Sequence, residues 1–209
     1  MLKQITTVTA LALAVMLSSA TAQQPDAAAV SWPLDQLAKV SQTEQPIISG
    51  TLGAAGLPDS NTLSALVAWV SVISGLPPIY DHPRVEHASA EKMAASRYRA
   101  LLPETYAKAG PISQAMSRYD ILAFYDDAAK TIYLADGWTG TTPAGQSVLV
   151  HEMVHHLQNV ADIKYECAQA REKLAYAAQQ KWLASRGLDF FREFETDPIS
   201  LMMRTVCVF

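Results

Sequence analysis

The hydrophobic and polar positions along the chain predict helices on both sides of a short pair of strands. A helix is expected where an apolar stretch begins after a capping residue and stops at glycine or proline. Thr142-Pro143 is one such start, because an N-cap residue stands directly before a proline at the first helical position. On these grounds helices are predicted over about 61–74, 90–102, 143–160 and 165–186, followed by a short one that Asp197-Pro198 opens.

Three other segments have the character of strands. Residues 121–125 and 131–134 are separated by the short segment DDAAK, so they predict a hairpin. Residues 79–88 are expected to be extended, with Pro83 confining them to an edge or a bend. Helices before and after a small antiparallel sheet indicate an α+β fold that is mostly helical.

The N-terminus has the three-part pattern of a secretory signal. A positively charged start precedes an apolar stretch over 9–17, and Ala20-Thr21-Ala22 offers the small residues that a signal peptidase requires. The apolar stretch is too short to span the hydrocarbon core of a bilayer as a helix. We therefore expect a signal peptide over 1–22, a mobile leader over 23–33 and a single domain over 34–209.

Composition narrows the class of protein. Half of the residues are hydrophobic and the net charge is −4, so the chain has the apolar content to close a core and is not expected to be disordered. A length of 209 residues favours one domain over two. The chain has no basic stripe, which argues against a nucleic-acid-binding protein. No later apolar run reaches membrane-spanning length, so we expect an exported, soluble product that is periplasmic or secreted.

Export changes the interpretation of the two cysteines. Cys167 and Cys207 are the only pair, and an oxidising compartment allows them to form a disulfide that ties the C-terminal tail to a helix. Two separate buried thiols are the alternative. The absence of a CxxC spacing argues against a structural zinc site with cysteine ligands.

The motif HExxH occupies residues 151–155 of the predicted helix over 143–160. Residues four apart lie on one helix face, so His151 and His155 can bind the same Zn²⁺ through ring nitrogens. Glu152 lies about 100° round the helix, from where its carboxylate can reach a metal-bound water without binding the metal. The helix is apolar on nearly all sides, and buried histidines and glutamates need partners. The pattern therefore predicts a zinc site with Glu152 as general base.

A catalytic zinc usually takes a third protein ligand and keeps its fourth position for water. The longer HExxHxxGxxH pattern is excluded, because Gln158 and Ala161 stand where glycine and histidine are required. Glutamates of the following helix remain, and we favour Glu172, since a small residue one turn later lets the two helices approach closely. Glu166 stays open, although a carboxylate at a helix start is also explained by the helix dipole. Asp162 is a more distant alternative.

Two stretches of the chain resemble known metallopeptidases. VLVHEMVHHLQN and the following YECAQAREKLAYAAQQKWL resemble the gluzincin branch of the zincins, of which thermolysin is a member, and more narrowly secreted bacterial proteins with a compact zincin-like domain. The resemblance covers about residues 121–183 and is weak before them. It implies that His151, His155 and Glu172 are zinc ligands and that Glu152 is the base. Because 17 positions separate His155 from Glu172, at or below the usual gluzincin spacing, Glu166 is kept as an alternative.

The resemblance implies a zinc-dependent metallopeptidase of the bacterial envelope that acts on peptide or protein substrates. In zincins the metal polarises both a water and the scissile carbonyl, while the glutamate removes the water's proton and passes it to the leaving amine. Substrate pairs as an extra strand with an edge strand beside the metal. We expect Ile132 and Tyr133 to belong to that edge strand. Tyr176, one turn after Glu172, is a further candidate for substrate contact, although an aromatic at this spacing is also typical of a core.

Two other functions stay open at this level. One is an envelope protein for binding or assembly that keeps zinc without turnover, and the other is a zinc hydrolase with a non-peptide substrate. Glu152 favours an enzyme, because a purely structural zinc site closes its fourth position and needs no carboxylate beside the metal.

Other polar and aromatic residues have weaker indications. Gln158 is placed to hydrogen-bond within the site or to fix the next helix. His156, His82 and His87 are interpreted as structural or solvated, and Trp182 as a packing residue.

Overall fold

The computed structural model describes residues 56–101 and 122–207. The chain divides into two units, Met1–Ala38 and Lys39–Phe209, and every described residue belongs to the second. The predicted signal peptide and leader lie outside the described residues.

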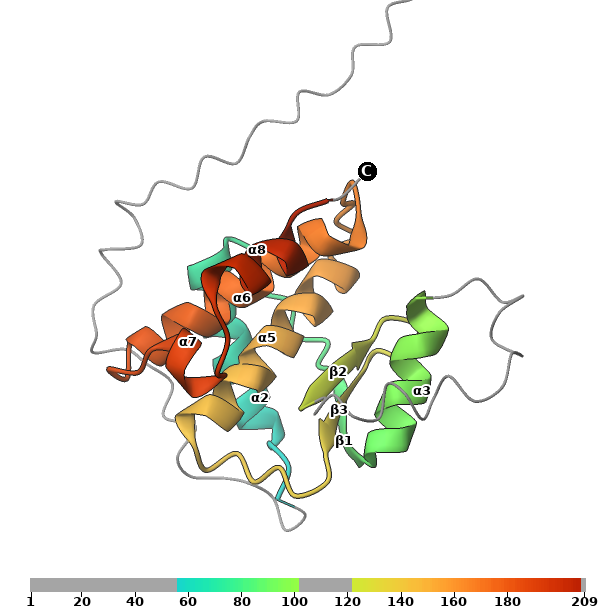
Figure 1. Cartoon of the computed structure of the whole chain (residues 1–209). Coiled ribbons are helices and arrows are strands. Elements are labelled where there is room, and N and C mark those ends of the chain that lie inside the picture. The colour runs from blue at the N-terminus through green and yellow to red at the C-terminus, as the bar shows by residue number, and fades with distance from the viewer. Residues whose placement is uncertain (1–55, 102–121, 208–209) are drawn as a thin grey trace, which may run out of the picture. The chain divides into compact units, whose positions relative to one another are not determined.

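The described residues form an α+β fold that is mostly helical, as the sequence predicts (Figure 1). In chain order the elements are α2 (Ser60–Ser74), β1 (Arg84–Ala88), α3 (Ala90–Leu101), β2 (Ala123–Asp126), β3 (Thr131–Ala135), α5 (Pro143–Val160), α6 (Ala168–Ala184), α7 (Phe190–Glu193) and α8 (Pro198–Thr205). No helix in the described ranges combines the length and hydropathy that a membrane span requires.

The predicted capping residues set the ends of several helices. Asp59 accepts a hydrogen bond from the backbone N–H of Thr62 at the start of α2, and Thr142 and Asp197 cap α5 and α8 in the same manner. Gly75 ends α2 with φ of 73°, a left-handed conformation that glycine adopts without strain. α6 begins at Ala168 rather than at 165, because the residue before it, Cys167, has an extended backbone and occupies the N-cap position.

The sheet has the strand order β1-β3-β2, and it corrects two predictions. β2 and β3 form the expected antiparallel hairpin, but β1 pairs with β3 in parallel, so the sheet is mixed rather than antiparallel. β3 is consequently the central strand, and the prediction that Ile132 and Tyr133 lie on an edge is wrong. The two edge strands among the described residues are β1, in agreement with the Pro83 that directly precedes it, and β2.

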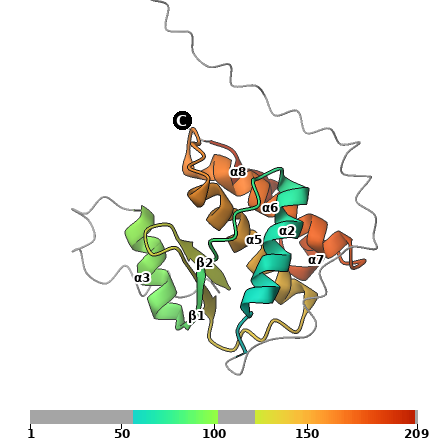
Figure 2. The same cartoon turned by 180° about the vertical axis from the view of Figure 1, so that it is seen from behind.

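The sheet is packed between α3 and α5 (Figures 1 and 2). Alternate residues of β3 face opposite sides: Ile132 and Leu134 are fully buried in the core, whereas the ring of Tyr133 lies 4.4 Å beneath the ammonium group of Lys92 on α3. β2 contacts α5 as well, through Tyr125. The sheet thereby brings β2 alongside the helix that carries the HExxH motif.

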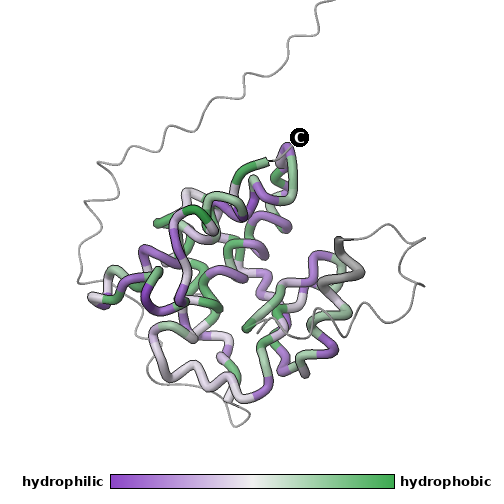
Figure 3. The backbone as a smooth tube through the Cα atoms, in the orientation of Figure 1, coloured by the Kyte–Doolittle hydropathy of each residue, from purple (hydrophilic) through white to green (hydrophobic). Residues whose placement is uncertain are grey.

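α5 is the centre of the hydrophobic core. Its residues from Gln146 to Gln158 are all buried, and the core cluster joins them to α2, α6 and the sheet. Trp182 of α6 is fully buried against Trp69 of α2, with ring centroids 5.0 Å apart in an edge-to-face arrangement, which confirms its packing role. Hydrophobic and hydrophilic stretches alternate along the surrounding helices (Figure 3).

The predicted disulfide between Cys167 and Cys207 is present. It joins the N-terminus of α6 to the segment after α8. α8 has no buried residue of its own and packs on α6, so the disulfide adds a covalent attachment to this packing.

Candidate metal centre

α5 places three functional groups of the HExxH motif in one buried region. The exposed fractions of these residues are 8% for His151, 7% for Glu152 and 6% for His155. A glutamate in particular is seldom so deeply buried without a partner. The two histidines are one turn apart, and their ring centroids lie 4.9 Å from one another. All three side chains line the same cavity.

Glu172 of α6 completes the group. Its Oε2 atom lies 3.1 Å from Nε2 of His151 and 3.3 Å from Nε2 of His155, and the two Nε2 atoms are 3.1 Å apart. Within the described ranges, these are the only histidine, cysteine and acidic residues grouped closely enough to hold a metal ion. Three donor atoms of the types that Zn²⁺ prefers thus form a small triangle.

The structure brings Glu172, rather than the two alternatives, to the histidines. Glu166 precedes α6 and does not line the cavity. Asp162 has a side chain that is 81% exposed and pairs with Lys164. α6 packs along α5, and Ala175 is fully buried at this contact, in agreement with the small residue expected there.

Two glutamines lie behind the histidines. Gln158 Oε1 is 3.0 Å from Nδ1 of His155, and Gln179 Oε1 is 3.1 Å from Nδ1 of His151. Gln158 also donates to the backbone carbonyl of Arg171 on α6, so it makes both contacts predicted for it. Gln179 was not anticipated, although it lies seven residues after the ligand candidate and hence on the same face of α6.

Charge at the centre favours an ionised glutamate. Burial raises the pKa of Glu172, but the proximity of His151 and His155 outweighs burial and holds this pKa well below its usual range. Glu172 is therefore an anionic donor at neutral pH.

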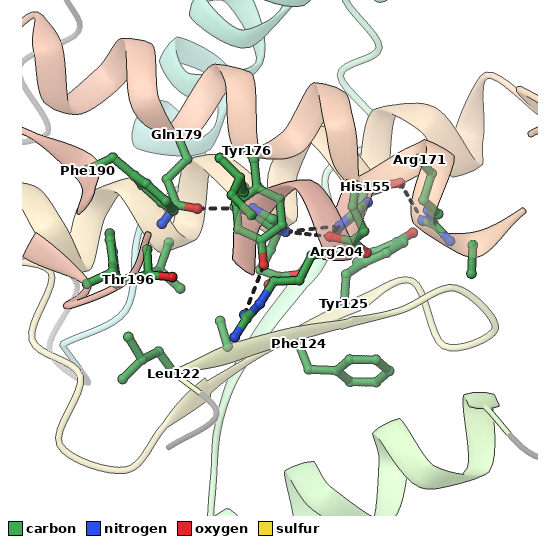
Figure 4. Close-up of a pocket in the computed structure, with 18 of the residues that line it drawn as sticks. Leu122, Phe124, Tyr125, His155, Arg171, Tyr176, Gln179, Phe190, Thr196 and Arg204 are labelled. Carbon is green, nitrogen blue, oxygen red and sulfur yellow. Dashed lines mark hydrogen bonds and ion pairs between the residues drawn. The ribbon is translucent and has the colours of Figure 1, made fainter. Parts of the chain in front are cut away.

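A cavity of about 1010 Å³ opens onto these groups (Figure 4). Its walls come from α5, α6, β2 and the segment that runs from α7 into α8. β2 lines it along its whole length, and the C-terminal segment contributes Phe190, Thr196 and Arg204. The size of the cavity suits a small molecule or several residues of a peptide.

Tyr176 stands closest to the histidines among the aromatic residues of the cavity. Its ring centroid lies 4.6 Å from that of His151, and its hydroxyl accepts a hydrogen bond of 3.3 Å from Arg204 of α8. Figure 4 shows Tyr176 and Arg204 reaching toward one another over β2. Tyr176 is thus in the cavity wall, whereas the other two predicted substrate contacts, Ile132 and Tyr133, do not line the cavity.

A comparison with protein families assigns residues 55–208 to a family described as a domain of unknown function, DUF6647. The chain belongs to this family. Searches of curated proteins and of solved structures found no match. In this member of the family, the matched region contains both helices of the candidate metal centre and all walls of the cavity.

The remaining histidines have structural partners. His156 is fully buried rather than at the surface; it hydrogen-bonds to the hydroxyl of Tyr125 at 3.1 Å and to the carbonyl of Asp81 at 2.6 Å. Burial lowers the pKa of His156, which favours a neutral ring. His82 contacts serine hydroxyls of α2, and His87 contacts the carbonyl of Ala135.

Proposed function

We propose that this protein is a zinc-dependent metallopeptidase of the bacterial envelope. The observation that carries the proposal is the triangle of His151 Nε2, His155 Nε2 and Glu172 Oε2, with sides of 3.1 to 3.3 Å. Donors bound to tetrahedral zinc at 2.0–2.1 Å are about 3.3 Å apart. The donor set and its spacing therefore fit a zinc ion held by these three residues.

The cavity gives the candidate metal centre an accessible side and a nearby carboxylate, neither of which a purely structural metal site needs. It leaves the centre accessible from one side, and Glu152 lines it beside the three donors. Bound zinc supplies Lewis acidity toward a water molecule and the carbonyl of the scissile bond. A site with three protein donors and an accessible side is typical of catalytic rather than structural zinc.

Glu152 is assigned the proton transfers. Its carboxylate accepts a proton from the attacking water and donates it to the leaving amine, which makes Glu152 base and then acid in one turnover. Burial of the side chain keeps bulk water from competing for the carboxylate. His151, His155 and Glu172 hold the metal, and Tyr176 is placed to contact the substrate next to His151.

The edge of β2 supports a peptide as substrate. Among the residues that the structure describes, β2 pairs with β3 on one side only, and the residues of β2 line the cavity. The carbonyl of Leu122 accepts from the N–H of Ala135, so Leu122, Phe124 and Asp126 direct their backbone groups toward β3. Ala123 and Tyr125 then present theirs at the free edge, where an extended peptide can add as a strand.

Export is proposed from the N-terminal pattern and is supported by the disulfide, which is characteristic of proteins in oxidising compartments. Peptide and protein substrates of the periplasm or the medium are accordingly the class to test.

The experiment compares wild type with Glu152→Gln on a mixed peptide library, with bound zinc measured in both. We expect one zinc per chain in both proteins and a rate of peptide cleavage that is at least 100-fold lower in the variant than in wild type. Wild type that binds zinc and cleaves no peptide would overturn the peptidase proposal in favour of an idle zinc-binding protein or a different hydrolase. Wild type that binds no zinc would overturn the metal centre itself.

A further inference from the structure

The two glutamines behind the histidines are among the most buried polar side chains described. Gln158 is 1% exposed and Gln179 is 4% exposed. Each directs its amide oxygen at Nδ1 of one histidine, His155 for Gln158 and His151 for Gln179. The second amide contact of each glutamine decides which ring nitrogen carries the proton.

For Gln158 the deciding contact is the backbone carbonyl of Arg171, which lies 3.0 Å from its Nε2. A carbonyl can only accept a hydrogen bond, so the NH₂ group of Gln158 must face Arg171. The amide oxygen of Gln158 therefore faces His155. Because that oxygen also only accepts, Nδ1 of His155 must be the donor.

For Gln179 the same argument runs through Ser147. The hydroxyl of Ser147 donates its single proton to the carbonyl of Ala144 at 2.7 Å, so its oxygen is left to accept from Nε2 of Gln179 at 3.3 Å. The amide oxygen of Gln179 then faces His151. Nδ1 of His151 must consequently donate as well.

A neutral imidazole with its proton on Nδ1 has a lone pair on Nε2. The triangle formed by His151, His155 and Glu172 then consists of three acceptors with no proton between them. Protons on both Nε2 atoms as well would make two positively charged rings whose Nε2 atoms are 3.1 Å apart, which their mutual repulsion opposes. A single proton on one Nε2 would leave at least one of the three atom pairs as two acceptors in contact. A cation in the triangle removes the conflict.

We propose that Gln158 and Gln179 are positioning residues that keep Nε2 of His155 and His151 free for a metal ion, and that they do so without charge. The inference rests on the proposed metal centre and adds a property to it. A carboxylate in place of either amide would make the histidine more basic and add negative charge. With two neutral amides behind the histidines, Glu172 supplies the negative charge of the triangle. A bound metal would then keep more of its positive charge than it would beside two carboxylates, and this charge would polarise a molecule that enters the cavity.

The first test measures the histidine tautomers in the full-length wild-type protein by nitrogen-15 NMR, with and without zinc. At a pH where the rings are neutral, we expect the Nδ1–H tautomer for both His151 and His155 in both samples. The Nε2–H tautomer at either residue of the metal-free protein would overturn the proposal. This measurement decides the inference even if the wild-type protein binds no zinc, so the two failures are distinguishable.

The second test measures zinc affinity by competition with a chelator for Gln158→Leu and Gln179→Leu. We expect each to bind zinc about 10–100-fold more weakly than wild type. Gln179→Glu should restore the affinity, because it keeps an acceptor oxygen for His151 and the hydroxyl of Ser147 can turn to donate to its other oxygen. Gln180→Leu is the matched control, because Gln180 follows on the same helix and does not line the cavity. Circular dichroism and Tm establish that each variant is folded. Folded leucine variants with wild-type affinity would overturn the proposal, as would a folded Gln179→Glu variant that binds zinc as weakly as Gln179→Leu.

Discussion

Arg171 and Asp127 form a two-bond ion pair that joins the turn of the β2–β3 hairpin to the first turns of α6. The guanidinium nitrogens lie 2.6 and 2.9 Å from the two carboxylate oxygens, and one of them also lies 3.4 Å from the carbonyl of His155. The pair thus connects three parts of the cavity wall next to the triangle of candidate metal donors.

Asp127→Asn is expected to lower the free energy of unfolding by about 1 kcal/mol, because a bidentate pair with a largely buried arginine is worth more than an exposed one. The arginine side chain is 24% exposed. Chemical denaturation measures the loss. Asp162→Asn is the control, since Asp162 pairs with Lys164 where both side chains are more than 80% exposed, and we expect no measurable change there. Equal losses in the two variants would contradict the special role of Arg171.

Ala123→Pro is expected to weaken peptide hydrolysis at least 10-fold while zinc binding is unchanged. Proline removes the N–H that Ala123 presents at the free edge of β2, and edge positions tolerate proline because the ladder to β3 keeps its bonds. Kinetics on a cleaved peptide and zinc analysis give the two readouts. Phe124→Pro, which removes an N–H that faces β3, should instead lower Tm. Unchanged cleavage by a folded Ala123→Pro variant would exclude the β2 edge as the substrate-binding strand.

Replacement of Cys167 and Cys207 by serine is expected to lower the free energy of unfolding by about 2–4 kcal/mol, because the bond closes a loop across a separation of 40 residues. The cavity wall should respond as well, since α8 has no buried residue to hold Arg204 against Tyr176. Hydrogen exchange of α8 and Tm with and without reductant measure the two effects. If hydrogen exchange in α8 is unaltered after reduction, packing on α6 alone holds α8 in place, and the prediction for the cavity wall is wrong.

Trp182→Leu is expected to destabilise the protein by about 2–4 kcal/mol, because it removes a fully buried ring and its edge-to-face contact with Trp69. Val72→Ala on α2 is the comparison, as Val72 is 66% exposed and should change stability by less than about 0.5 kcal/mol. Thermal unfolding with zinc held constant distinguishes the two. Similar Tm values for both variants would contradict the central position of Trp182 in the core.

Removal of zinc by a chelator is expected to lower Tm, because zinc bound only by the folded state stabilises it by mass action. The ion would also relieve repulsion among the three donors of α5 and α6. His155→Ala should show a Tm that does not respond to zinc. A wild-type Tm that is equally insensitive to zinc would count against the metal centre.

Much of this fold follows from local sequence rules. Asp59, Thr142 and Asp197 cap helices through contacts within three residues along the chain, so their effect is visible without tertiary structure. The spacing of His151 and His155 fixes one helix face in the same way. Glu172 could be favoured over Glu166 because a small residue, Ala175, follows it by one turn and lets the two helices approach closely.

The features that the sequence did not disclose depend on distant contacts. β1 meets β3 at Arg84 and Thr131, and no local pattern specifies a parallel partner so far along the chain. The choice of edge strand was wrong for this reason. Gln179 had a local signal, its position two turns after Glu172, but its role required knowing that Ser147 stands opposite.

The parallel pairing of β1 with β3 also bears on the order in which the chain folds. The donors of the metal centre lie on two consecutive helices joined by a short connection, whereas the sheet is complete only after β1 finds a strand beyond α3 and β2. Closing the longer loop costs more entropy, so contacts between α5 and α6 are expected to form early and the docking of β1 late. An ion could thus be captured by a nascent helical hairpin before β1 completes the sheet beside it.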